Sequence, residues 1–399
     1  MLRLIKFFGV FLITAIIIFG FVIGWNWKTF SVFLDNRDAL IEGNEWIIKT
    51  SSLKGLSEYI GENPNHSSIA SVPVNRPVSI IFYQEKKERT QGTTANFFIL
   101  LAYAIEIDHG NVSAEELIDW NQVEQYQLPG VDESVHLDTY RTAMERGWIN
   151  NRSISIENSL HLLTQYNDLA LADYLWWELN PDIWDFITSN LNLTSTDMPL
   201  PFSGLYLSIS PDLQSMGFED ITDFYAENPR HVWREHVTEQ SRLFATTGSD
   251  RDQFLEYMER NRLGITFMQE RDAMAFFPKT TPEEMTHILH KLIHQELINE
   301  NVSNMVLSFM RWPMNYQSGI ESDFSDYGAI YDNRMGLMNG IDFGTSAYTG
   351  DTTVQAFYLD MLPIGFWFHA SGGHMHQDFM QRLIYDPSMI QQMNSVLSN

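Results

Sequence analysis

A continuous run of apolar side chains covers residues 97–105, directly after a polar turn at residues 92–96. A helix with this pattern is apolar on nearly every face, so we expect it to lie buried in the middle of a domain, over about residues 95–108. Thr93 or Thr94 is placed to cap its first turn, and Gly110 to end it in a left-handed conformation. The pattern therefore predicts a central helix with threonine hydroxyls at its start.

The rest of the pattern predicts a sheet built from both ends of the chain, with helices between. Strand signals are carried by residues 68–74, 78–83, 354–359 and 365–369. Helical spacing favours helices over residues 114–120, 156–179, 182–191 and 282–299, with residues 211–280 helical and looped. This order favours an α/β (α+β) fold, in which helices flank an antiparallel sheet and an all-helical lobe occupies about residues 111–280.

The first 30 residues differ in kind from the rest. Arg3 and Lys6 precede an uncharged apolar run over residues 7–24, which reaches the lower limit for a membrane span. No small-residue cleavage site is evident where Trp25 and Trp27 follow, so an uncleaved anchor is favoured over a cleaved signal peptide. We expect a single-pass anchor in the cytoplasmic membrane (1–30), a stalk and leading helix (31–64) and a periplasmic or extracytoplasmic domain (65–399).

Composition excludes several kinds of function. The 399 residues include 51 acidic and 25 basic side chains, a formal net charge of −26, which argues against a nucleic-acid partner. The chain contains no cysteine, so disulfides, thiolate catalysis and cysteine-bound zinc are ruled out. With 44% hydrophobic residues the chain has ample material for a core.

Six segments, in the same order, resemble motifs of the class A β-lactamase-like, penicillin-recognising serine hydrolases of bacteria. They lie at residues 92–104, 123–130, 166–170, 281–285, 311–314 and 340–345. The resemblance spans roughly residues 65–390 and implies the β-lactamase/transpeptidase-like fold. In that family a serine attacks a carbonyl, a lysine one turn later helps to remove its proton, and a Ser-Asp-Asn loop holds the substrate. A second lysine, on the edge strand of the sheet, attracts the substrate carboxylate.

The chemical positions implied by the resemblance are altered here. Thr93 stands at the serine position and Asn96 at the lysine position. The remaining motif positions are Asn167, Asp168 and Leu169 in the second element, and Asp342, Gly344 and Thr345 in the third. An amide is not basic, so Asn96 cannot accept the proton of Thr93. The backbone N–H groups of Thr93 and Thr345 could still form an oxyanion hole, and Asp342 is expected to repel carboxylates.

Two functional hypotheses follow. The favoured one is a binding pseudoenzyme that has lost β-lactam or peptide hydrolysis and contacts a cell-wall peptide or another envelope protein. The alternative is an active amidase or β-lactamase that uses Thr93 with Asp168 or Asp342. We expect no cofactor and no metal: His287, His290 and His294 share a helical face, but no carboxylate is fixed beside them, which favours a solvated or packed surface.

Overall fold

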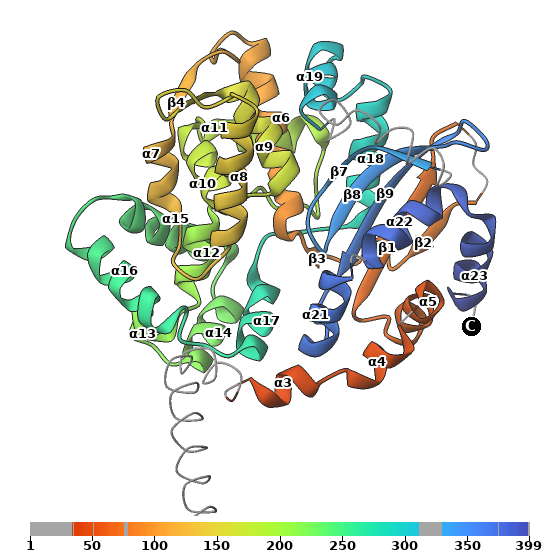
Figure 1. Ribbon diagram of the computed structural model, residues 1–399, viewed down its shortest axis with the longest axis horizontal. Helices are drawn as coiled ribbons and strands as arrows, with labels where there is room; N and C mark the ends of the chain where they lie inside the picture. Colours follow the sequence, from red (N-terminus) through yellow and green to blue (C-terminus); the bar gives the residue numbers. More distant parts are fainter. Residues whose placement is uncertain are drawn as a thin grey trace, which may run out of the picture.

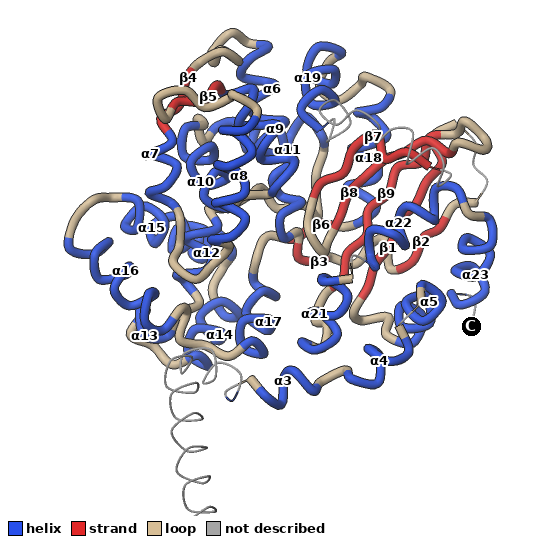
Figure 2. Tube along the Cα trace, in the orientation of Figure 1, coloured by secondary structure: helices blue, strands red, loops and turns tan. Residues whose placement is uncertain are grey.

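The computed structural model describes residues 34–397 apart from 35, 51, 76–78, 311–328 and 374. Its centre is a five-stranded antiparallel sheet in the order β2-β1-β9-β8-β7 (Figures 1 and 2). The strands are β1 (Ser67–Pro73), β2 (Ile81–Tyr83), β7 (Ala329–Met335), β8 (Gly340–Ser346) and β9 (Thr352–Leu359). Strand β1 pairs with β9, with Ala70 opposite Ala356, so the sheet joins the two ends of the chain as predicted.

A helical lobe stands beside the sheet (Figure 1). It contains α6 (Asn96–Asp108), α7 (Trp120–Val123), α8 (Glu133–Glu145), α9 (Ile156–Tyr166), α10 (Leu169–Glu178) and α11 (Asp182–Leu191). It continues with α12 (Phe202–Ser208), α13 (Pro211–Gln214), α14 (Phe218–Glu227), α15 (Arg230–Ala245), α16 (Ser249–Asn261) and α17 (Phe267–Ala273). Residues 97–105 of α6 are all buried, which confirms the predicted central helix.

Short elements connect the lobe to the sheet. The 3₁₀ turn η1 (Gly92–Ala95) leads into α6, and β3 (Arg89–Thr90) pairs with β6 (Lys279–Thr280). Two further 3₁₀ turns are η2 (Glu124–Tyr126) and η3 (Met274–Phe276). A second ladder, β4 (Leu117–Asp119) with β5 (Ser153–Ser155), lies at the far end of the lobe. The turn that carries Thr93 therefore lies where the lobe and the sheet meet.

Helices cover both faces of the sheet. Helices α18 (Pro282–Ile293) and α19 (Glu300–Met310) pack on one face. The other face is covered by α5 (Leu53–Glu62), α21 (Ile364–Gly372), α22 (Met375–Tyr385) and α23 (Pro387–Leu397). In β9, Val354, Ala356 and Tyr358 belong to the core that includes the lobe, whereas Phe357 and Leu359 belong to the core under α22. This alternation is the period of two expected of a strand buried on both faces.

The N-terminal part that the structure describes packs against the body. Helices α3 (Arg37–Ile41) and α4 (Asn44–Lys49) contact α21, and α5 contacts α22 and α23. Leu56, Tyr59 and Ile60 of α5 are fully buried. The predicted membrane anchor lies outside the described residues, and none of the described helices is long and apolar enough to cross a bilayer.

Several local predictions were wrong, each for a reason visible in the packing. Residues 117–119, predicted as helix, form β4, because they pair with β5. The helix predicted over 156–179 is divided in two, since Asn167 adopts a left-handed conformation and Asp168 caps a new helix. Residues 365–369, predicted as a strand, lie in α21. The helix predicted over 282–299 ends at Ile293.

The prediction for the start of α6 was wrong, whereas the prediction for its end is confirmed. Neither predicted threonine caps the helix, because the chain enters through the turn η1 and the N-cap residue is Ala95. The Thr94 hydroxyl instead donates to the Gln91 carbonyl, 2.8 Å away. Gly110 has φ of +75°, so the predicted left-handed residue after the helix is confirmed.

Candidate functional site

Thr93 lies in η1, next to the loop that joins β7 to β8. Its Oγ1 accepts a hydrogen bond from the backbone N–H of Leu337, with a donor–acceptor distance of 3.1 Å. Gly336 has φ of +95°, and a Cβ built on it would stand 2.6 Å from Thr94 Cγ2. The backbone at Gly336 therefore lies close against the Thr94 side chain, an approach and a positive φ that favour glycine at this point.

The third motif element is corrected by the sheet order. The edge strand beside the lobe is β7, whereas Asp342 lies on the inner strand β8, fully buried and directly across from Arg334 in the strand register. Asp342 therefore does not occupy the edge-strand position that its motif match implied. The resemblance placed the element one strand too late along the chain.

Gly344 and Thr345 are likewise far from Thr93. The end of β7 that reaches Thr93 is Met335, whose partner on β8 is Ile341. Thr345 lies four residues further along β8, about 13 Å away at roughly 3.3 Å per residue. An oxyanion hole formed by the N–H groups of Thr93 and Thr345 therefore does not fit this strand register.

No general base lies next to Thr93 in the part of the chain that the structure describes. Asn96 is fully buried at the start of α6, and neither its amide oxygen nor its amide nitrogen has a hydrogen-bond partner among these residues. No carboxylate, imidazole or amine of a described residue is within hydrogen-bond distance of Thr93 Oγ1. Within the described residues, the alcohol therefore lacks a group that would activate it.

The second motif element forms the junction between α9 and α10. Asn167 is buried with φ of +54°, and Leu169 begins α10. Asp168 Oδ1 accepts from the backbone N–H of Ala170 at 3.0 Å and of Leu171 at 3.2 Å. The carboxylate therefore caps α10, a structural role.

The other oxygen of Asp168 binds a histidine that the sequence analysis missed. His136 Nδ1, on α8, lies 2.8 Å from Asp168 Oδ2, and both side chains are buried. The imidazole stacks on Trp120 with ring centroids 5.4 Å apart and an interplanar angle of 20°. Its only sequence signal was a position one turn after Asp132, which does not distinguish it from a surface histidine.

The cluster around His136 has shifted pKa values. Burial opposes protonation of His136, but the hydrogen bond and charge of Asp168, with Glu124 and Asp132, raise the pKa of His136 above its ordinary value. Burial, and then the charge of Asp168, raise the pKa of Asp132 to about 7. Two acids and a histidine thus share a poorly solvated region at the start of α8 and α10.

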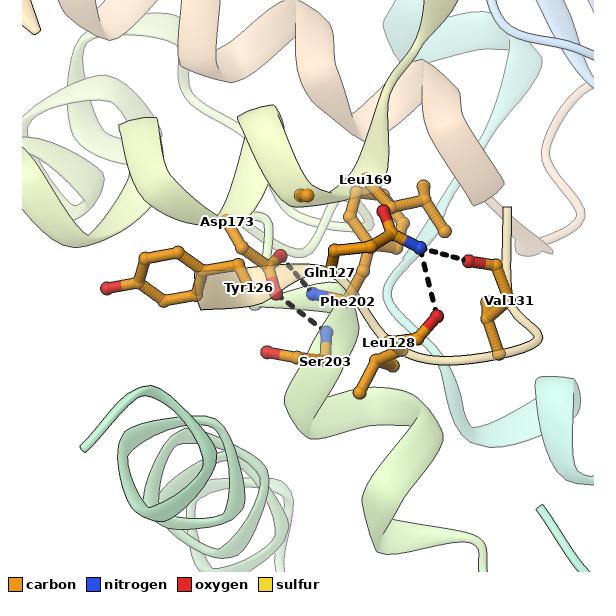
Figure 3. Close-up of a pocket in the computed structure, with 9 residues that line it drawn as sticks. Tyr126, Gln127, Leu128, Val131, Leu169, Asp173, Phe202 and Ser203 are labelled. Atoms are coloured by element: carbon orange, nitrogen blue, oxygen red, sulfur yellow. Dashed lines mark hydrogen bonds between the residues drawn. The ribbon is translucent and has the colours of Figure 1, made fainter. Parts of the chain in front are cut away.

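A small pocket lies beside this cluster (Figure 3). It is lined by Tyr126, Gln127, Leu128, Val131, Leu169, Ala170, Asp173, Phe202 and Ser203. Its empty space is about 200 Å³, part of which is open solvent, so the pocket is small.

The polar groups of the pocket are already bonded to the chain. Asp173 accepts from the N–H groups of Phe202 at 2.5 Å and Ser203 at 2.7 Å, and Gln127 Nε2 donates to the carbonyls of Leu128 and Val131. Burial raises the pKa of Asp173 to about 7, although the bonds from Ser203 and Phe202 lower it. The Asp173 bonds therefore hold the start of α12 against α10, and the Gln127 bonds stabilise the conformation of the 127–131 loop.

The three histidines singled out in the sequence lie on α18 and at its C-cap. The rings of His290 and of the C-cap residue His294 have centroids 4.4 Å apart, and His287 lies one turn before His290. Within the described ranges no group of three or more His, Asp or Glu side chains is arranged to hold a metal ion. His376, on α22, places Nε2 2.8 Å from the carbonyl of Leu337, so it supports the residue whose N–H reaches Thr93.

No protein-family model matches the sequence, and a comparison with curated proteins finds no match. Solved structures do match. One is the β-lactamase from Sphaerobacter thermophilus, at 10% identity and a TM-score of 0.48, covering 86% of this chain and 97% of that one. Another is the TLA-1 extended-spectrum β-lactamase, at 14% identity and a TM-score of 0.47, covering 88% and 100%.

A third similar structure is a PBP-A mutant in an acyl-enzyme complex with penicillin G, at 9% identity and a TM-score of 0.44, covering 87% of this chain and 95% of that one. The predicted resemblance is confirmed as a structural match to β-lactamases and PBP-A across most of the chain. With such low identities and TM-scores below 0.5, the match concerns the arrangement of helices and strands and carries no conclusion about chemistry.

Proposed function

We propose that this chain is a membrane-anchored, periplasm-facing protein of β-lactamase-like fold that binds a cell-wall peptide or another envelope protein without hydrolysing it. The observation that carries the proposal is the environment of Thr93. Its oxygen accepts the Leu337 N–H, and the side chain one turn later, Asn96, is a buried amide. An alcohol without a base is a poor nucleophile at neutral pH.

The absence of a general base is expected to have a large effect on the reaction rate. General-base assistance typically contributes about 10²–10⁴ in rate, or roughly 3–5 kcal/mol of the activation barrier. Thr93 also carries a methyl group that hinders attack. A hydrogen bond donated to its oxygen makes the remaining lone-pair density less available. These three effects act in the same direction and favour binding over turnover.

The active-hydrolase alternative lacks a base in either suggested position. Both oxygens of Asp168 are engaged, one by the first turn of α10 and one by His136. Asp342 is buried on an inner strand. Because Asp342 is buried on β8, we do not expect it to repel carboxylate ligands.

Covalent labelling tests the loss of chemistry. The purified protein is incubated for hours with benzylpenicillin or with a fluorophosphonate probe, and its intact mass is measured. We expect no adduct on the wild type or on Thr93→Ala, while a β-lactamase treated in parallel is labelled. A mass increase of one penicillin on the wild type that disappears in Thr93→Ala would establish an active hydrolase and overturn the proposal.

Binding and anchoring need their own measurements. Co-sedimentation with purified cell-wall sacculi, or a rise in melting temperature with soluble wall peptides, is expected if the ligand is a wall peptide. If neither measurement detects binding and crosslinking captures an envelope protein, the partner is an envelope protein and not a wall peptide. The anchor predicts that the chain stays in the membrane pellet after a carbonate wash and is digested by external protease in spheroplasts. Full-length protein in the soluble periplasmic fraction would overturn the anchor.

A further inference from the structure

Exposed apolar side chains gather at the end of the molecule where the described chain begins. Among the described residues, fifteen large hydrophobic side chains are exposed, and seven of them belong to or adjoin α3, α4, α17 and α21. We call this surface the basal face; its exposed residues are Leu34, Ile41, Ile48, Met268, Met361, Trp367 and Phe368. In Figure 1, α3 and α4 run along the lower edge of the molecule, with α17 and α21 above them.

Contacts between these helices hold the basal face in place. A Cβ on Gly365 of α21 would stand 2.4 Å from the carbonyl oxygen of Leu40, so the backbones of α21 and α3 are in direct contact. Arg271 of α17 forms an ion pair of 2.9 Å with Glu42, and the Phe267 N–H donates to Asn36 Oδ1 at 2.7 Å. These contacts join the N-terminal helices, α17 and α21 into one surface.

The aromatic part of the basal face is fixed and unusually free of charge. The rings of Phe267 and Phe368 are 5.6 Å apart, and those of Trp367 and Phe368 are 5.0 Å apart. Residues 361–377 include no Asp, Glu, Lys or Arg, although 19% of the whole chain is charged and about three would be expected. Exposed tryptophan and phenylalanine in a segment that carries no charged residue suit the boundary between lipid and water.

The connection to the predicted anchor places this surface near a bilayer. The apolar run ends at Gly24, ten residues before Leu34, where the described chain begins. Ten residues span at most about 35 Å even when fully extended. A body held on so short a connection meets the membrane at high effective concentration, and it does so with the face from which the connection leaves.

We propose that the basal face lies against the phospholipid surface, with Trp367, Phe368 and Ile48 in the headgroup region. The partner is lipid and not a second copy of the chain. The inference rests on the anchoring part of the proposed function and is independent of whether the site hydrolyses anything. It implies that the end of the helical lobe carrying β4 points away from the membrane (Figure 1).

The absence of cysteine makes a direct test possible. A single cysteine is introduced at Phe368, or at Ile48 on α4 as a second probe, and is labelled with a fluorophore that brominated lipid quenches. Leu117→Cys is the matched control, because Leu117 is an exposed apolar residue on β4 at the other end of the lobe. Each full-length variant is reconstituted into phosphatidylethanolamine–phosphatidylglycerol vesicles, with its melting temperature compared with that of the wild type.

We expect brominated lipid to quench the labels at 368 and 48 at least threefold more strongly than the label at 117. Equal quenching at all three positions in protein that floats with the vesicles would overturn the basal-face proposal alone. If the label at 368 were shielded from quenching to a degree that depends on protein concentration and not on lipid, the basal face would be assigned to a second copy of the chain. That result would also overturn the basal-face proposal. Failure of the full-length chain to float with vesicles would overturn the anchor itself.

Discussion

Replacing Asp168 with asparagine separates two roles of one carboxylate. The asparagine carbonyl can still accept from the Ala170 and Leu171 N–H groups, so the cap on α10 is kept. The oxygen that faces His136 Nδ1 at 2.8 Å becomes an NH₂ group, which cannot accept the imidazole proton. The variant therefore removes the charge and one hydrogen bond while leaving the helix start intact.

The expected effect has a definite sign with pH. In the wild type the pKa of His136 is raised, so its contribution to stability is complete below its ordinary value of 6.5 and is lost as the pH rises through the folded-state pKa. In Asp168→Asn burial remains and lowers that pKa, so the variant gains stability over the same rise in pH. Asp132 acts in the same direction, because loss of the Asp168 charge moves its pKa down from about 7.

The magnitude follows from the bond that is lost. A buried hydrogen bond between charged partners contributes about 1.5–3 kcal/mol. We therefore expect Asp168→Asn to lower the free energy of unfolding by about 2–3 kcal/mol at pH 5.5 and by about 1 kcal/mol or less at pH 8.5. Each unit of difference between the two folded-state pKa values of His136 contributes about 1.4 kcal/mol to that change.

Guanidinium unfolding followed by tryptophan fluorescence, at pH values between 5.5 and 8.5, measures the effect. Asp138→Asn is the control, since Asp138 lies on the same helix as His136, in an exposed pair with Arg141. This variant should lower the free energy of unfolding by no more than about 0.5 kcal/mol at any pH. The His136→Phe variant, measured with and without Asp168→Asn, isolates the part of the pH dependence that is due to Asp132. A loss for Asp168→Asn that is equal at both ends of the pH range would refute the coupling.

Two further predictions concern the segments that surround the site. Gly336→Ala should cost about 2–4 kcal/mol and lower the melting temperature, because the new Cβ would stand 2.0 Å from the Asn339 carbonyl oxygen; Gly350→Ala, also at positive φ but with nothing within 4 Å, should cost only about 1 kcal/mol. Equal losses of stability in the two variants would show that the positive φ alone sets the cost, and not the contact with Asn339. Glu284→Gln should destabilise the protein above pH 4.5 and cease to matter at lower pH, because hydrogen bonds from Thr196 and Thr194 lower the pKa of Glu284 against the effect of burial. Urea midpoints at pH 3.5 and 7 measure it, and a pH-independent loss would contradict the assignment.

The sequence predicted the large elements because their patterns are strong and local. The run at 97–105 is apolar in every turn, and it became the buried helix α6. The β-branched signals at both chain ends became β1, β2 and β9. Errors occurred where tertiary pairing or capping decides, as in β4 and in the break at Asn167, since neither leaves a periodic signal.

The candidate site was harder to predict from the sequence than the fold. Thr93 and Asn96 could be placed because they begin a helix whose position is unambiguous. Asp342 could not, because only the sheet order identifies β7 as the edge strand. His136 and His376 reach the site from α8 and α22, distant in sequence, so no local pattern could have assigned them.

The retained and the altered motif positions differ in what they do for the fold. Among these positions, Asp168 caps α10 and so has a structural role that is independent of any reaction. Asn96 has none, because its buried amide has no hydrogen-bond partner among the described residues, and such a group typically costs about 1–3 kcal/mol. An apolar side chain would pack at that position without this cost.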